Sequence, residues 1–275
     1  MAVLAMDTAT ETLVAAVGAG GTAIASAAVR VPRGHSRLLQ PTVQQLLRAA
    51  GLGPEELTGI CVGIGPGSYT GVRMAVSTAK AMAVTLGIPL YTVSTLLAMA
   101  EAAVPQRGDG PVRVMPLLYA RRARAFGAAY TLAGAERLAW QVETPVQVRP
   151  IDDWLAAWRG SEDGTSGGSA RTSHGLQAEA YGTPQVRFLV HDFNQQPSLA
   201  QTASAWRAAA DVALALCDVA AGMGPALLRL ADGGQAVVYA GDDIHAVSPD
   251  YALPVEAEAK LAERGEARGN DTGRR

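Results

Sequence analysis

A glycine-rich segment between an apolar run and a helix-forming stretch places the tightest constraint on the fold of this chain. It reads Gly-Pro-Gly-Ser-Tyr-Thr-Gly over residues 65–71 and follows the apolar run 59–62, which predicts a buried strand. Residues 72–86 contain no proline, and a glycine and a proline follow them as a helix stop signal. The sequence therefore predicts a tight strand-to-helix turn, with Ser68 or Thr70 capping the helix.

This turn is a candidate anion site, because free N–H groups and the positive end of a helix dipole favour phosphate. Two familiar phosphate loops do not fit it. A Walker A loop needs Lys-Ser or Lys-Thr after its last glycine, but Gly71 is followed by Val72 and Arg73. The dinucleotide fingerprint fails as well, since three residues separate Gly67 from Gly71. Two interpretations of residues 65–71 therefore remain: a phosphate site, or a tight glycine-rich turn that binds no ligand.

The N-terminal residues are a second candidate nucleotide element. Residues 3–6 predict a strand that ends on Asp7, and the following turn carries Thr8 and Thr10 before a predicted hairpin. This order resembles the opening of the actin-like ATPase and sugar-kinase superfamily, where the aspartate faces phosphate or its metal. The usual glycine two residues after the aspartate is Ala9 here. Asp7 is therefore either a phosphate or metal contact or a carboxylate that caps its own turn.

Four segments of the first hundred residues match one family in type and order. They read Gly-Pro-Gly-Ser-Tyr-Thr-Gly-Val-Arg at 65–73, Ala-Met-Asp-Thr-Ala-Thr-Glu at 5–11, His-Ser at 35–36 and Val-Ser-Thr-Leu at 93–96. Together they resemble the TsaB (YeaZ) family of bacterial tRNA threonylcarbamoyladenosine biosynthesis proteins. The resemblance implies a non-catalytic subunit that binds the catalytic paralogue TsaD and the ATPase TsaE. It would support transfer of a threonylcarbamoyl group to N6 of adenosine 37 in tRNAs reading ANN codons.

The candidate nucleotide residues come from both elements described above. They are Asp7, Thr8, Thr10, Gly65, Gly67, Ser68, Thr70, Gly71 and Arg73. A helix N-terminus without a lysine offers few charge-assisted hydrogen bonds. We therefore expect no tightly bound cofactor, and ATP or ADP only weakly or at the interface with the partner.

A metal site and catalytic residues are not expected. TsaD and the peptidase family into which these proteins have been grouped hold a metal with two histidines four residues apart on the helix predicted over residues 36–50. Here His35 is followed at that spacing by Leu39, and one imidazole cannot make the site. The alternative function is a small-molecule kinase or ATPase, with a metallopeptidase less favoured. A kinase needs a second acidic Mg²⁺ ligand at the start of its second lobe, where this chain has Tyr119.

The resemblance implies an α/β, two-lobed actin-like ATPase (ASKHA, ribonuclease H-like) fold with mixed sheets flanked by helices. Glycine and charge at residues 105–111 indicate a boundary. We expect a first lobe with partner-binding helices over 1–105, a second lobe over 106–255 and a disordered tail over 256–275. Within the second lobe, residues 198–221 predict a long helix.

The helix expected at 72–86 has a core-facing set at helical spacing and an opposite face with almost no charge. A surface helix of a monomer normally carries more charge, so this face is predicted to meet another protein. In TsaB relatives this helix and the preceding one contact TsaD, or a second copy in a homodimer, and the two assemblies compete. The candidate interface residues are Arg37, Gln40, Gln44, Met74, Ser77, Thr78, Ala81 and Thr85.

Composition, net charge and cysteine content limit the class of protein further. Hydrophobic residues make up 49% and charged residues 17% of the 275 positions, which is typical of a globular protein. A formal net charge of −2 gives no general attraction to nucleic acid, so tRNA is expected only through the complex. Cys61 and Cys217 predict buried free thiols. With no signal-peptide pattern and no apolar run of membrane length, we expect a cytoplasmic protein without membrane contact.

Overall fold

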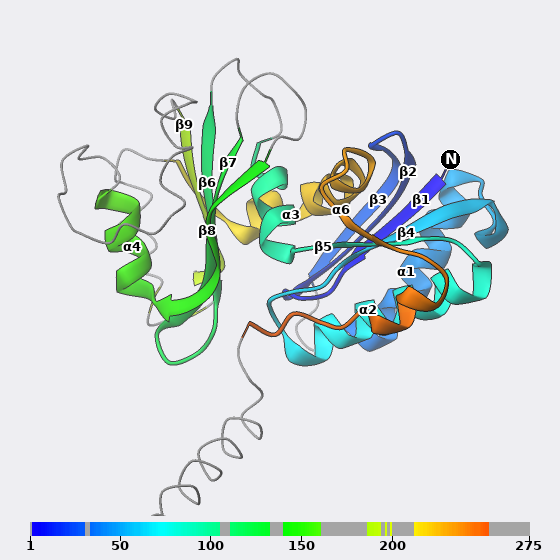
Figure 1. Cartoon of the computed structure of the whole chain (residues 1–275), viewed down its shortest axis with the longest axis horizontal. Helices are drawn as coiled ribbons and strands as arrows, with labels where there is room; N and C mark the ends of the chain where they lie inside the picture. Colours follow the sequence, from blue (N-terminus) through cyan, green and yellow to red (C-terminus); the bar gives the residue numbers. More distant parts are fainter. Residues whose placement is uncertain are drawn as a thin grey trace, which may run out of the picture.

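Two β-sheets, with a pair of helices between them, organise the chain in the computed structural model (Figure 1). The structure describes residues 2–30, 34–104, 111–132, 140–160, 186–193, 196, 199 and 212–252. The first sheet has the strand order β11-β5-β4-β1-β2-β3. Its strands are β1 (Ala2–Asp7), β2 (Thr12–Ala19), β3 (Thr22–Arg30), β4 (Leu57–Gly63), β5 (Leu90–Val93) and β11 (Val237–Tyr239).

The second sheet has the strand order β10-β9-β6-β7-β8. Its strands are β6 (Val112–Tyr119), β7 (Arg124–Leu132), β8 (Trp140–Pro150), β9 (Val186–His191) and β10 (Val212–Ala215). In both sheets three consecutive strands pair antiparallel, and the next two strands along the chain add parallel beside the first of the three. The two sheets therefore share one topology, and the predicted α/β class with two mixed sheets is confirmed.

The helices divide the molecule into five layers. They are α1 (His35–Ala50), α2 (Tyr69–Leu86), α3 (Thr95–Ala102), α4 (Ile151–Gly160) and α6 (Leu216–Asp232). Helices α1 and α2 cover the outer face of the first sheet, and α4 covers the outer face of the second. Helices α3 and α6 fill the space between the sheets (Figure 1). Strand β2 is buried over most of its length because helices pack on both of its faces.

A buried carboxylate joins the middle layer to the second sheet. Glu101 of α3 has no exposed surface. It accepts hydrogen bonds from Nε1 of Trp140 on β8 at 2.7 Å and from Nε of Arg229 on α6 at 2.6 Å. The buried carboxylate therefore satisfies the buried indole N–H of Trp140 and pairs with the partly exposed guanidinium of Arg229 across three elements.

The end of the described chain contains a strand that the sequence did not predict and a segment that packs on the first sheet. Residues 212–215 form β10, because they pair in parallel with β9, so the helix predicted over 198–221 is wrong at these four residues, and α6 begins at Leu216. Residues 198 and 200–211 of that predicted helix lie outside the described residues. Residues 216–252 also return to the first sheet: α6 packs on it and β11 pairs with β5. Part of the segment expected to belong to the second lobe therefore contacts the first sheet. The predicted tail at 256–275 lies outside the described residues.

Both cysteines are free thiols, but only Cys61 is buried. Cys217 is exposed in the first turn of α6, so its predicted burial is wrong. Within the described ranges, no helix is long and apolar enough to cross a membrane.

Candidate functional site

The glycine-rich turn leads directly from β4 into α2. Ser68 is the N-cap residue, and its Oγ accepts a hydrogen bond from the N–H of Gly71 at 3.3 Å. Of the two predicted caps, Ser68 rather than Thr70 fills the role, while Thr70 is exposed in the first turn. Gly65 has a φ of +100°, a conformation that side chains with a Cβ rarely adopt. The predicted strand-to-helix turn is confirmed.

The polar groups of this turn bond within the chain. The N–H of Ser68 donates to the carbonyl of Ala9 at 2.7 Å, and the hydroxyl of Thr8 donates to the carbonyl of Gly71 at 2.6 Å. A Cβ on Gly67 would lie 2.4 Å from the Ala9 oxygen, which requires glycine there. The turn after β1 thus packs against the glycine turn and accepts the N–H of Ser68, which an anion would otherwise need.

Asp7 is buried beneath the same turn. One carboxylate oxygen accepts the N–H of Ala9 and the other accepts the hydroxyl of Thr95, each at 2.6 Å. Burial raises the pKa of Asp7, although both hydrogen bonds act to lower it. Thr10 bonds locally to Thr12. These contacts match the turn-capping alternative for Asp7, and the catalytic alternative gains no support from them.

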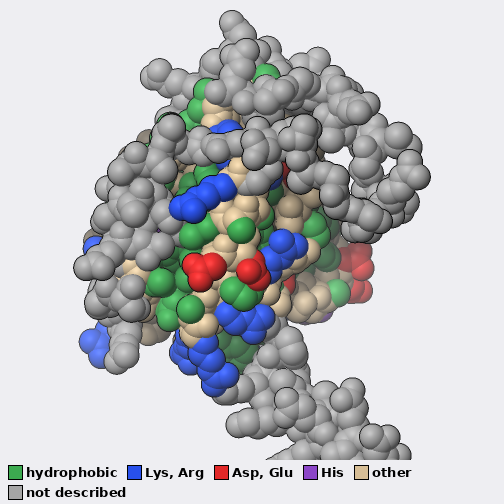
Figure 2. Space-filling view, turned by 90° about the vertical axis from the view of Figure 1, so that its left-hand side faces the viewer, with side chains coloured by type: hydrophobic (Ala, Val, Ile, Leu, Met, Phe, Trp, Pro, Cys, Tyr) green, Lys and Arg blue, Asp and Glu red, His purple; other side chains and the backbone are tan. Residues whose placement is uncertain are grey.

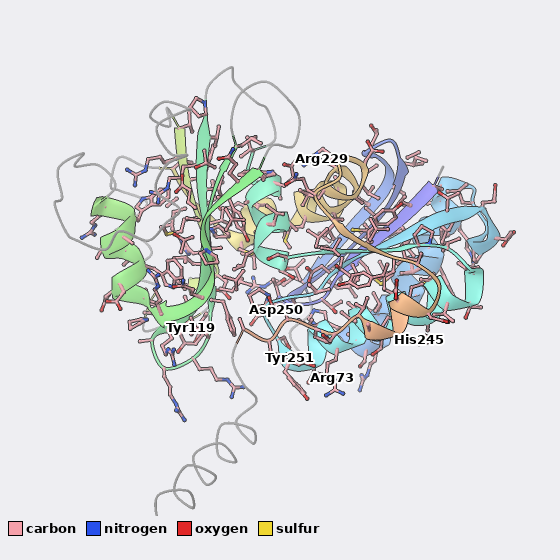
Figure 3. All side chains as sticks on the ribbon, in the orientation of Figure 1. Arg73, Tyr119, Arg229, His245, Asp250 and Tyr251 are labelled. Carbon is pink, nitrogen blue, oxygen red and sulfur yellow. The ribbon has the colours of Figure 1, made fainter. Side chains whose placement is uncertain are left out.

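A C-terminal strap, residues 241–252, runs along α2. Nζ of Lys80 donates to the carbonyls of His245 and Val247, both at 2.8 Å. The N–H of Asp250 donates to the carbonyl of Ile64 at 2.7 Å, so the strap is fastened to the glycine turn itself. Figure 3 shows Asp250 and Tyr251 beside the start of α2. The strap closes the turn from outside.

An aromatic contact completes the strap. Tyr251 stacks on Tyr69 with ring centroids 4.8 Å apart, and the Arg73 guanidinium lies 5.2 Å from the Tyr69 centroid and donates to its hydroxyl. Sequence reasoning placed Arg73 in the candidate site but did not identify Tyr69, Lys80 or the strap. The available signal was Pro-Asp-Tyr at 249–251, which resembles the family's Pro-x-Tyr segment.

We expect the isolated chain to bind ATP no more tightly than a Kd of about 0.1 mM, because the N–H groups of Gly65, Ser68 and Gly71 and the carboxylate of Asp7 are already bonded inside the chain. Isothermal titration calorimetry with MgATP measures this directly. Micromolar binding that disappears in Thr70→Ala and Arg73→Ala would contradict the expectation and favour the kinase alternative.

Asp192 is a residue that sequence reasoning missed. Its Oδ1 accepts the N–H of Tyr119 at 2.8 Å, so the carboxylate that follows β9 lies beside the position where a kinase would need its second acidic ligand. Burial raises the pKa of Asp192 to about 7, and the negative charge of Glu11 adds to the rise. The sequence signal was only that an aspartate follows a predicted strand.

The outer face of α1 and α2 contains an open groove of about 480 Å³. It is lined by Gln40, Pro54, Ser77, Thr78, Ala81, Met82, Thr85 and Leu86. Five of the predicted interface residues therefore come together in one groove, while Arg37, Gln44 and Met74 are not among its lining residues. Arg37 and Gln44 are exposed on α1, and Met74 is half-buried on α2. No charged side chain lines the groove.

The second metal-ligand position of TsaD is absent here. Leu39, four residues after His35, is buried in the apolar core beneath α1. In the part of the chain that the structure describes, no three His, Cys, Asp or Glu side chains gather closely enough to hold a metal ion.

The chain is similar in sequence to proteins of tRNA threonylcarbamoyladenosine biosynthesis. Residues 29–156 match the family model described as TsaD, tRNA N6-adenosine threonylcarbamoyltransferase. The tRNA threonylcarbamoyladenosine biosynthesis protein TsaB of Escherichia coli is 36% identical over 130 residues, which are 47% of this chain and 55% of that protein. The Bacillus subtilis protein of the same name is 30% identical over 263 residues, covering 96% of this chain and 99% of the relative.

A solved structure shares the fold. YeaZ from Pseudomonas aeruginosa superposes with a TM-score of 0.59 at 23% identity, and the match covers 92% of this chain and 98% of that one. Because the alignment with the B. subtilis protein spans almost the full length of both chains, the family assignment does not rest on the glycine turn alone. The chain belongs to the TsaB family of tRNA threonylcarbamoyladenosine biosynthesis proteins.

Proposed function

We propose that this chain is a non-catalytic subunit that binds TsaD and supports transfer of a threonylcarbamoyl group to N6 of adenosine 37 in tRNAs reading ANN codons. TsaD supplies the metal and the reacting groups, and the ATPase TsaE binds the assembled pair. The tRNA is held through the complex. Isolated chains pair as a homodimer in a cytoplasmic setting.

The uncharged groove between α1 and α2 is the observation that carries this proposal. Ser77, Ala81 and Thr85 are exposed and recur every four residues, so they form one stripe along α2. Small side chains let a second helix approach closely, and polar Arg37 and Gln44 on α1 suit the rim of such a contact.

The non-catalytic role is supported by the hydrogen bonds that the polar groups around the glycine turn make within the chain. Asp7 bonds to Ala9 and Thr95, and His35 has no second ligand four residues on. An adenine nucleotide, ATP or ADP, binds at this turn only where a partner rearranges or completes it. The kinase alternative requires the opposite, an open loop in the isolated chain.

Ala81→Glu tests the proposal, because it places a carboxylate in the groove. We expect affinity for TsaD to fall on the order of a hundredfold, or about 3 kcal/mol, since the charge is buried without a partner. The homodimer should weaken in parallel, because both assemblies use the same surface. Size-exclusion chromatography and calorimetry, with and without TsaD, measure both effects.

Ala156→Glu is the matched control: it makes the same change at an exposed alanine of helix α4 in the second lobe. We expect this variant to bind TsaD as the wild type does. If folded Ala81→Glu forms both assemblies at wild-type affinity, the groove is not the interface. If the wild type does not bind TsaD at all, the proposed function is wrong.

A further inference from the structure

The turn between β6 and β7 combines an unusual backbone with a concentration of positive charge. Arg121, Arg122 and Ala123 have φ values of 65°, 52° and 53°, in the left-handed region that disfavours residues with a Cβ. Glycine or asparagine would adopt this conformation more readily. Two arginines at such positions indicate that their side chains serve a purpose that the turn alone does not require.

The turn is fixed firmly at its base. The N–H of Ala120 donates to the carbonyl of Arg124 at 2.8 Å, and the N–H of Arg124 donates to the carbonyl of Arg121 at 3.0 Å. The N–H of Ile151, the first residue of α4, donates to the carbonyl of Ala123 at 2.9 Å. Residues 121–124 are nonetheless exposed. We call residues 120–124 the arginine turn: it carries three exposed arginines, of which Arg124 donates to the carbonyl of Val148 at 3.3 Å.

Charge around the arginine turn is unevenly distributed. Figure 2 shows Lys and Arg side chains gathered at the lower end of the face that carries α4, with acidic side chains above them. Asp152 and Asp153 are exposed in the first turn of α4, directly after Ile151, and limit the basic surface on that side. A polyanion would therefore lie along the lower edge of the molecule, away from α4.

That same edge carries the aromatic contact of the strap. In Figure 3, Tyr119 at the end of β6 lies along the lower edge together with Tyr251 and Arg73 of the first lobe. Tyr69, on which Tyr251 stacks, is 45% exposed. Exposed arginines bind phosphate oxygens in pairs, which is how many proteins contact the backbone of RNA.

We propose that the arginine turn contacts the phosphate backbone of the tRNA that the complex modifies. This inference rests on the proposed function and extends it, because it gives this subunit a direct RNA contact of its own. The polyanion that the complex of the proposed function handles is a tRNA, and this favours RNA over an acidic protein surface as the occupant. The formal net charge of −2 is compatible with this, since only a local cluster is positive.

The test uses the complex of the full chain with TsaD and a labelled, unmodified anticodon stem-loop RNA. The variant Arg121→Gly with Arg122→Gly removes two charges and also relieves the left-handed backbone, so it should fold at least as well as the wild type. We expect RNA affinity to fall about tenfold near 0.1 M salt and the slope of log K against log salt to become shallower by about 1 to 2.

Two further variants separate charge from structure. Arg30→Ala with Arg159→Ala removes two exposed arginines elsewhere and should leave RNA affinity and its salt slope nearly unchanged. Arg121→Lys with Arg122→Lys keeps the charges and should retain most of the salt slope, at lower affinity.

The outcomes distinguish this inference from the proposed function. If the glycine variant binds TsaD and also binds the RNA with wild-type affinity and slope, the inference is wrong and the function stands. If it keeps RNA affinity but loses TsaE, the turn is a protein-docking surface and the RNA contact is likewise overturned. If the wild type forms no complex with TsaD, the function and this inference fail together.

Discussion

Replacing Glu101 with alanine is expected to lower the free energy of unfolding by about 3–5 kcal/mol. The Glu101 side chain is 1% exposed and is the shared acceptor for Trp140 and Arg229. Its removal leaves the indole N–H without an acceptor inside the protein and the guanidinium without its counter-charge. Because Arg229 is 29% exposed, water compensates it in part, so the indole and the cavity account for much of the loss.

Urea unfolding followed by circular dichroism measures this change, provided the m-value stays constant. Glu101→Gln keeps the volume and one acceptor oxygen, so its loss should be smaller than that of the alanine variant. Glu55→Ala removes an exposed carboxylate and should change stability by less than about 0.5 kcal/mol. A loss below about 1 kcal/mol for Glu101→Ala would show that the middle layer does not depend on this carboxylate.

Gly71→Ala is expected to lower the free energy of unfolding by about 3 kcal/mol, although alanine forms helices better than glycine by up to about 1 kcal/mol. A Cβ at position 71 would lie 2.0 Å from the carbonyl oxygen of Thr8. The turn after β1 must then move away from α2, which breaks the 2.6 Å hydrogen bond from the Thr8 hydroxyl to Gly71.

Gly222→Ala is the matched control, because Gly222 also lies within a helix, α6. There a Cβ would meet Ala102 atoms at 3.5 Å, which is ordinary van der Waals contact. The same substitution should therefore stabilise the protein, by up to about 1 kcal/mol. Equal signs for the two variants in urea unfolding would contradict the close approach of Thr8 to α2.

The local part of the fold was predictable because short segments carry their own signals. The glycine turn, the Ser68 cap and helix α2 follow from residues adjacent in sequence, and so does the buried set beneath α2. The uncharged outer face is a property of helical spacing alone. Helical spacing alone therefore predicts that Ala81 lies on the uncharged face of α2 that lines the groove.

The remaining features depend on contacts between distant residues. The strap binds Lys80 through the carbonyls of His245 and Val247, which no local pattern encodes. The placement of Asp192 beside Tyr119 depends on strand order in the second sheet. Residues 212–215 have an alanine-rich context that favours helix, yet pairing with β9 makes them a strand, because tertiary contacts override weak local propensity.

The position of α6 between the sheets has a consequence for dissecting the protein. Helix α6 and β11 come from the last part of the described chain but cover and extend the first sheet. A fragment that ends near residue 105 would expose the inner face of that sheet, including Ala5, Val14 and Ala16, to water. The first sheet and its covering helices are therefore not an independent module. A truncation that removes α6 and β11 also removes part of the structure built on the first sheet.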